Sequence, residues 1–128
     1  MAAPQFAALD RESYISLATF RRDGRAVATP VWFARSGERL YVFSERAAGK
    51  VKRLRNSARA RVTACSVRGR VHGEWIDARA RVVAESDTER RAYAALHAKY
   101  GWQMKVVDFF STLTGRIKER AIVEIEPA

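Results

Sequence analysis

Short segments in which apolar and polar residues alternate constrain this chain more than any other feature of its sequence. In residues 13–20 every second position shares one face, the period of a β-strand. A polar turn follows, with Gly24 available for a positive φ angle, and the first three strands are expected to form an antiparallel meander. The strand patterns cover 13–20, 26–34, 39–45, 60–67, 74–85 and 120–126.

Helical segments interrupt these strands. They cover about 49–57, 86–100 and 102–113. Ser86 and Glu89 have the spacing of a capping box, which predicts the start of the second helix, and Gly101 is expected to end it. A chain of 128 residues has room for one domain with a modest core. The order of elements predicts a small, mainly antiparallel β-barrel in a single domain over residues 1–128.

Composition excludes several classes of function. The N-terminus lacks the apolar core of a signal peptide, and no apolar run is long enough to span a membrane, so a cytoplasmic protein is expected. No Ser/His/Asp set and no metal-ligand spacing is present, and Cys65 is expected to be a small core residue. His72 and His97 are expected on the surface or in packing contacts. No catalytic residue and no metal site is predicted; a cofactor would supply any reactivity.

The segment 46–62 concentrates positive charge at a short helix between two strands. The net charge of the chain is +10, which favours anionic partners. A helix N-terminus offers unpaired N–H groups and a partial positive charge, so a phosphate binds there readily. Lys50 falls in the first turn of this helix, and we expect it to meet a cofactor phosphate. A solvated basic helix face is the alternative.

Pro30 lies inside a predicted strand, although proline cannot donate a hydrogen bond to a β ladder. It therefore marks a sheet edge or a bulge. Backbone groups beside Thr29 and Pro30 would then be free to face a planar ligand, with a simple edge strand as the alternative. Trp32 would either flank that ligand or cover an interface.

These features combine in residues 18–64, "ATFRRDGRAVATPVWFARSGERLYVFSERAAGKVKRLRNSARARVTA". This stretch resembles the N-terminal half of the flavin and deazaflavin split-barrel oxidoreductases, the pyridoxamine 5'-phosphate oxidase-like superfamily. "TPVWF", "LYVFS" and "GKVKRLRNSARARV" are most similar to its coenzyme F420-dependent branch. The resemblance implies a split barrel of six to seven mostly antiparallel strands. It also implies a homodimer with a cofactor in each of two interface grooves.

The resemblance also implies which residues bind the cofactor. The strand that carries Thr29, Pro30, Val31 and Trp32 would lie along the tricyclic ring. Ser44 and Lys50 would hold the phosphate, with Arg53 as a further contact. Lys52 and Arg55 are candidates for the acidic tail of F420.

Two departures separate this chain from the FMN oxidases that it resembles. Those enzymes typically place an arginine where Thr29 stands and a lysine near Ala34, so F420 is expected here in preference to FMN. The C-terminal extension of the true vitamin B6 oxidases is also missing, so oxidation of pyridoxamine phosphate is not expected.

Three functions remain open at this point. The first is an F420-dependent reductase that acts on an enone, a quinone or a similar small molecule. The second is an FMN- or haem-binding protein of the same fold, or a carrier of F420 without turnover. The third is a small basic nucleic-acid-binding barrel, which the core-like positions of the early aromatic residues disfavour.

Overall fold

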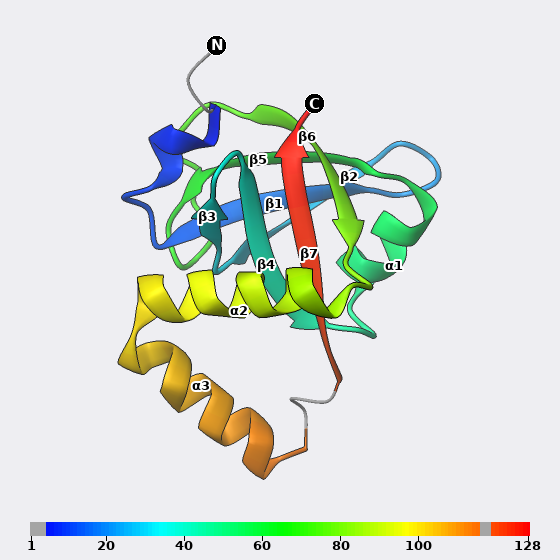
Figure 1. The fold of residues 1–128 in the computed structure, drawn as a ribbon. Coiled ribbons are helices and arrows are strands. Elements are labelled where there is room, and N and C mark those ends of the chain that lie inside the picture. The colour runs from blue at the N-terminus through cyan, green and yellow to red at the C-terminus, as the bar shows by residue number, and fades with distance from the viewer. Residues whose placement is uncertain (1–4, 116–118) are drawn as a thin grey trace.

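A seven-stranded antiparallel sheet curls into a half-barrel in the computed structural model, which describes residues 5–115 and 119–128 (Figure 1). The strands are β1 (Tyr14–Phe20), β2 (Ala26–Val31), β3 (Ala34–Ser36), β4 (Arg39–Glu45), β5 (Arg59–Cys65), β6 (Ile76–Val82) and β7 (Arg120–Pro127). The helices are the 3₁₀ helix η1 (Gln5–Leu9) and the α-helices α1 (Gly49–Asn56), α2 (Ser86–Tyr100) and α3 (Trp102–Leu113). The predicted mainly-β split barrel is confirmed. The expectations for a single domain and for the N-terminus extend to residues 1–4 and 116–118, outside the described residues.

The order of strands in the sheet is β2-β1-β5-β6-β7-β4-β3. The hairpin of β1 and β2 forms as predicted, with Gly24 at a φ of 90° in its turn. The predicted three-strand meander is wrong, because β4 pairs with β3 and β7 and makes no pairing with β2. The strands predicted over 60–67 and 74–85 are shorter, and they pair with each other through residues 59–62 and 76–79.

The strand predicted over 26–34 is also wrong as one element, since it breaks at Trp32 and Phe33. Tyr100 of α2 explains the break. Its hydroxyl accepts a hydrogen bond from the Phe33 N–H at 3.0 Å and lies 2.9 Å from the Phe33 carbonyl, to which it can donate. The backbone groups that would continue the β ladder are thus bonded to a side chain. The chain can therefore leave β2 at one edge of the sheet and begin β3 at the other.

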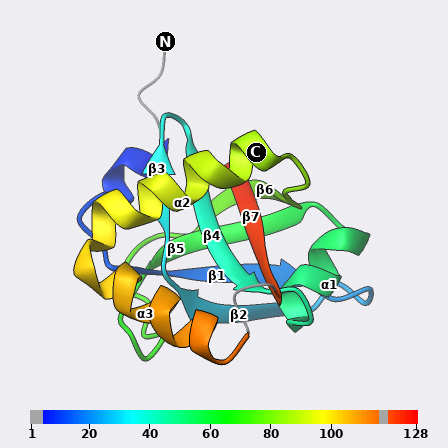
Figure 2. The same ribbon diagram turned by 60° about the horizontal axis from the view of Figure 1, so that its bottom comes forward.

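The helices cover different parts of the half-barrel (Figures 1 and 2). α1 lies across one end, where it contacts β1 and β6 and adds Leu54 to the main core. α2 packs against β3 and β4, and α3 packs against α2 and contacts β7, where Arg120 donates hydrogen bonds to Asp108 and Ser111. The largest fully buried side chains of the main core come from η1 and from both halves of the sheet. They are Phe6, Ile15, Leu17, Phe33, Leu40, Val42, Val62 and Ile125.

The predicted capping box at the start of α2 does not form. Glu85, not Ser86, is the N-cap residue, and no side chain caps the helix. The Glu85 carboxylate instead accepts two hydrogen bonds from Arg81, each at 3.0 Å. The first turn closes through the backbone, where the Glu89 N–H donates to the Glu85 carbonyl. The boundary is therefore shifted by one residue from the sequence pattern.

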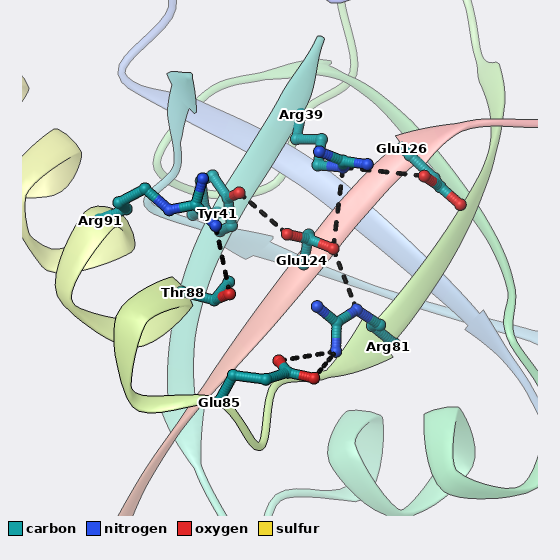
Figure 3. A network of polar contacts seen from close by, with 8 residues as sticks. All are labelled: Arg39, Tyr41, Arg81, Glu85, Thr88, Arg91, Glu124 and Glu126. Atoms are coloured by element: carbon teal, nitrogen blue, oxygen red, sulfur yellow. Dashed lines mark hydrogen bonds and ion pairs between the residues drawn. The ribbon is translucent and has the colours of Figure 1, made fainter. Parts of the chain in front are cut away.

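A polar network crosses the outer face of β4, β7 and β6 at Glu124 (Figure 3). Glu124 is only 8% exposed, and its carboxylate accepts hydrogen bonds from the Tyr41 hydroxyl at 2.9 Å and the Arg81 Nε at 3.0 Å. Arg39 lies 3.8 Å from the same carboxylate. Burial and the Glu124 carboxylate raise the pKa of Tyr41, so its hydroxyl remains a donor. The network satisfies a charge that would otherwise be costly to bury.

We predict that Tyr100→Phe lowers the free energy of unfolding by about 1–3 kcal/mol, because two buried backbone groups of Phe33 lose their partner. Tyr93→Phe is the matched control on the same helix, and it should cost less because the Tyr93 side chain is only partly buried. Urea denaturation measures both. Equal losses in the two variants would show that the Phe33 contacts do not stabilise the fold.

Candidate functional site

The start of α1 carries positive charge without any side-chain cap. Burial lowers the pKa of the Lys50 ammonium, and the nearby Arg53 lowers it further, while Glu45 opposes both. Burial and the neighbouring Arg21 likewise lower the pKa of Arg53. The cations at this helix start are thus crowded against one another. A bound anion would relieve that repulsion.

Arg53 joins α1 to the first strand. Its Nε donates a hydrogen bond to the Thr19 Oγ1 at 2.6 Å. The guanidinium crosses close to the first residue of the helix, where a Cβ on Gly49 would lie 2.7 Å from the Arg53 Nη1. Glycine at position 49 therefore leaves room for the guanidinium. As a result, the helix start and the end of β1 meet at one end of the half-barrel.

A shallow hollow opens between α1 and the turn of the β1–β2 hairpin. Its lining is Arg21, Arg22, Asp23, Arg25, Gly49, Lys52 and Arg53. Asp23 is engaged by Arg25, at 2.9 Å between the Oδ2 and the Nε. In the described part of the chain, no carboxylate lies within ion-pair distance of the other lining cations. The hollow therefore has a surplus of positive charge next to the helix start.

Lys52 and Arg53, which the sequence resemblance proposed as cofactor contacts, line this hollow together with three arginines of the turn that it did not propose. The signal that could have found them is the segment "RRDGR" at 21–25. A hairpin returns the chain at its turn, and the basic helix has to pack near one end of the same strands. The turn arginines and the helix can therefore meet.

The predicted ring-binding strand is an edge of the sheet, as Pro30 indicated. Thr29 lies opposite Leu17, on the same face as Thr19, to which Arg53 is bonded. The Thr29 Oγ1 is buried and has no hydrogen-bond partner among the described residues. Such an unsatisfied hydroxyl is costly unless a bound group completes it. Val31, two residues further along the same face, packs its side chain against the main core.

Trp32 is half-buried in a cluster of aromatic residues that is separate from the main core. Its ring stacks on Tyr100, with centroids 4.3 Å apart and planes at 8°, and it meets Phe43 edge-on at 6.4 Å. Both distances lie in the range of favourable aromatic pairs. Trp32 is therefore already packed within its own chain.

The remaining predicted residues do not line the basic hollow. Lys50 is half-buried nearby, and the Ser44 hydroxyl contacts only the Glu45 carbonyl among the described residues, at 3.5 Å. Arg55 faces a separate groove on the other side of α1. That groove is lined by Arg46, Leu54, Arg55, Ala58, Ala80, Arg81, Val82, Val83, Ala84, Glu89 and Ala121. The structure thus brings together Lys52, Arg53 and the turn arginines and places Arg55 elsewhere.

The other side chains that could act as catalysts or ligands are the two histidines and Cys65, and both histidines have structural partners. His97 lies 2.8 Å from Asp108, and His72 lies 2.6 Å from Glu12. Cys65 is buried, as predicted, and burial raises the pKa of its thiol. Within residues 5–115 and 119–128, no three possible metal ligands gather, and no helix is long and apolar enough to cross a membrane.

Lys99 of α2 packs its ammonium group against an aromatic ring of the core. Its Nζ lies 3.3 Å from the centroid of the Phe33 ring. Burial lowers the pKa of its ammonium group to about 8, although Asp10 and Glu12 oppose the shift. A substitution of Lys99 would therefore change core packing as well as charge.

Comparisons with known proteins agree with this architecture. The family described as pyridoxamine 5'-phosphate oxidase matches residues 3–128, so the chain belongs to that family. No curated protein matches the chain.

Solved structures share the fold at low sequence identity. An F420 reductase is 18% identical with a TM-score of 0.63, covering 100% of this chain and 96% of its own. The haem storage protein HutZ from Vibrio cholerae is 14% identical with a TM-score of 0.70, at coverages of 92% and 83%. A FAD-binding protein from Mesorhizobium loti is 20% identical with a TM-score of 0.62, at 93% and 82%.

Proposed function

We propose that this chain is an F420-dependent oxidoreductase that acts on an unsaturated or quinone-like small molecule. The observation that carries the proposal is the hollow of unneutralised cations beside the uncapped start of α1. It lies at the same end of the β1–β2 hairpin as the Thr19–Arg53 contact. A phosphate-bearing cofactor with an acidic tail needs several cations, and this end of the molecule offers them. The similarity to an F420 reductase supports the choice of cofactor.

Each residue has a distinct part in this proposal. Lys50 and Ser44 meet the phosphate at the helix start, and Arg53 adds a fixed guanidinium, held in place by Thr19. Lys52 receives the acidic tail together with the turn arginines, and Arg55 extends that surface on the far side of α1. The edge strand from Thr29 to Trp32 lies along the ring.

Reduced F420, when bound, supplies a hydride to an electron-poor conjugated acceptor. The chain itself binds the cofactor, orients its ring against β2 and excludes water from it. No side chain is assigned as a proton donor. The edge position of β2 suits this role, because one side of its backbone remains unpaired by other strands.

A second candidate is a flavin- or haem-binding protein without this activity. The FAD-binding and haem storage proteins of the same fold favour it. Thr29 and Ala34 weigh against FMN, because FMN oxidases of the superfamily typically have cationic residues at these places. F420 and FMN both carry a phosphate, so the phosphate contacts alone do not distinguish them.

We predict that F420 binds more tightly than FMN or FAD. Isothermal titration calorimetry of the purified protein with each cofactor, at one fixed salt concentration, measures the three dissociation constants. A smaller dissociation constant for FMN or FAD would reject the F420 assignment while leaving the family unchanged.

Lys50→Ala should weaken F420 binding roughly ten- to a hundredfold, because a charge-assisted phosphate contact is worth about 1.5–3 kcal/mol. The fold should become no less stable, since a crowded cation leaves a helix N-terminus. Arg90→Ala on α2 is the control of equal charge change, since the Arg90 side chain is exposed and lies outside both the hollow and the proposed interface. Equal losses in the two variants would mean that only the general positive field attracts F420.

We also propose that the chain forms a homodimer that covers α3. Trp102 is 73% exposed there, and its apolar neighbours on the same helix face are Val106, Phe109, Phe110 and Leu113. An apolar helix face of this length is typical of an interface. Trp75, at 36% exposed, remains a further candidate, whereas Trp32 is already packed against Tyr100.

Light scattering should therefore give the mass of a dimer at micromolar concentration. Phe109→Asp should shift it to the monomer, because a charge would be buried at the contact. A wild-type chain that stays monomeric under these conditions would refute the dimer.

A further inference from the structure

The hydroxyl of Tyr100 connects segments that are far apart in the sequence. It accepts a hydrogen bond from the Phe33 N–H and lies 2.9 Å from the Phe33 carbonyl and 2.8 Å from the Ser13 carbonyl. Its single proton can reach either carbonyl. Burial raises the pKa of Tyr100 to about 12, although its bond to the Phe33 backbone opposes the shift. The hydroxyl thus stays protonated at neutral pH, and it ties the start of β1 to the break between β2 and β3.

The ring of the same residue determines where the indole of Trp32 lies. The two rings are nearly parallel, at 8°, with centroids 4.3 Å apart. Phe43 meets the indole edge-on with centroids 6.4 Å apart, and the Arg120 guanidinium lies 4.6 Å from the Phe43 ring centroid. Trp32 is thus held between side chains of α2 and β4, directly after the last residue of the edge strand β2.

We propose that Tyr100 is a positioning residue for the cofactor ring, acting through Trp32. By bonding the Phe33 backbone and stacking on the indole, it fixes Trp32 at the end of β2, beside the strand where the ring is proposed to lie. This inference rests on the proposed function. The proposal adds Tyr100 of α2 to the residues that act on the cofactor, although Tyr100 neither lines the basic hollow nor takes part in the β-ladder of β2.

The position of Trp32 can be tested without any cofactor. Protein labelled with 5-fluorotryptophan gives a fluorine resonance for each of Trp32, Trp75 and Trp102, and Trp32→Leu assigns the first of them. In Tyr100→Phe the Trp32 resonance should shift or broaden, and the other two should stay in place. Tyr93→Phe removes a hydroxyl of the same helix that bonds to Arg120 and not to the Phe33 backbone, and it should move the Trp32 resonance less. A Trp32 resonance that responds equally to both variants would overturn the positioning role.

The consequence for the ring is tested by a double-mutant cycle on F420 affinity. Trp32→Leu and Tyr100→Phe should each weaken the affinity for F420 roughly tenfold. The double variant should bind F420 no more weakly than the single variant with the lower affinity. Additive losses would overturn the proposal that Tyr100 acts through Trp32. Inorganic phosphate, as a probe of the hollow alone, should bind equally to all four proteins.

The two arms separate this inference from the proposed function. If wild-type protein binds neither F420 nor flavin, the proposed function fails, and with it the role of Tyr100 towards a cofactor. The fluorine spectra then still show whether Tyr100 fixes Trp32. If F420 binds with unchanged affinity to Tyr100→Phe, the positioning role is wrong and the function stands. Since Trp32→Leu keeps every Tyr100 hydrogen bond, it remains informative if Tyr100→Phe folds poorly.

Discussion

The arrangement of the sheet depends on the interruption of the strand at Trp32 and Phe33. Without it, residues 26–36 would form one long strand, and β3 could not pair with β4 at the opposite edge. A broken ladder leaves buried backbone groups that need other partners. The Tyr100 hydroxyl provides them, and the same contact places α2 over β3 and β4. The contact between Tyr100 and Phe33 therefore lets β2 end at one edge of the half-barrel and places α2 over β4.

Electrostatics differ between the two sides of this scaffold. On the outer face of β4, β7 and β6, the carboxylate of Glu124 lies among Arg39, Arg81 and Tyr41, so charge is matched where it is buried. At the start of α1 the cations lower one another's pKa, and the Glu45 carboxylate offsets this only in part at Lys50. Unmatched charge of one sign costs stability in the free protein. An anion bound there would offset this repulsion, which is the physical reason for proposing a ligand at this end.

The strand pattern in the sequence was sufficient for most of the fold because burial on one face imposes a period of two. Its failures share a cause. The meander, the continuous strand 26–34 and the capping box at Ser86 were inferred from neighbours in sequence. In the structure, each of these segments instead has a partner that is not its neighbour in the pattern. β4 pairs with β7, the Phe33 backbone bonds to Tyr100, and Glu85 bonds to Arg81. The contact of Tyr100 spans 67 residues, and no local pattern encodes it.

The candidate site shows the same division. The basic helix predicted Lys52 and Arg53 at the hollow, since charge density is a local property of the sequence. The turn arginines contribute because a hairpin and a helix meet at one end of the barrel, which is a property of the packing. Arg55 follows the helical period instead and faces the groove beside β6. Residues three or four apart share a helix face, whereas Arg53 and Arg55 are only two apart.

Binding and selectivity therefore depend on different parts of the molecule. In the proposed function the hollow recognises charge, which any phosphate-bearing cofactor offers, whether deazaflavin or flavin. Selection between such ligands has to come from the ring and from groups beyond the phosphate. Along the proposed ring position this chain has the uncharged Thr29 and the Trp32 indole, which stacks on Tyr100. Beyond the phosphate, the turn arginines extend the positive surface past the helix start, which favours a ligand with further negative charge over one that ends at its phosphate.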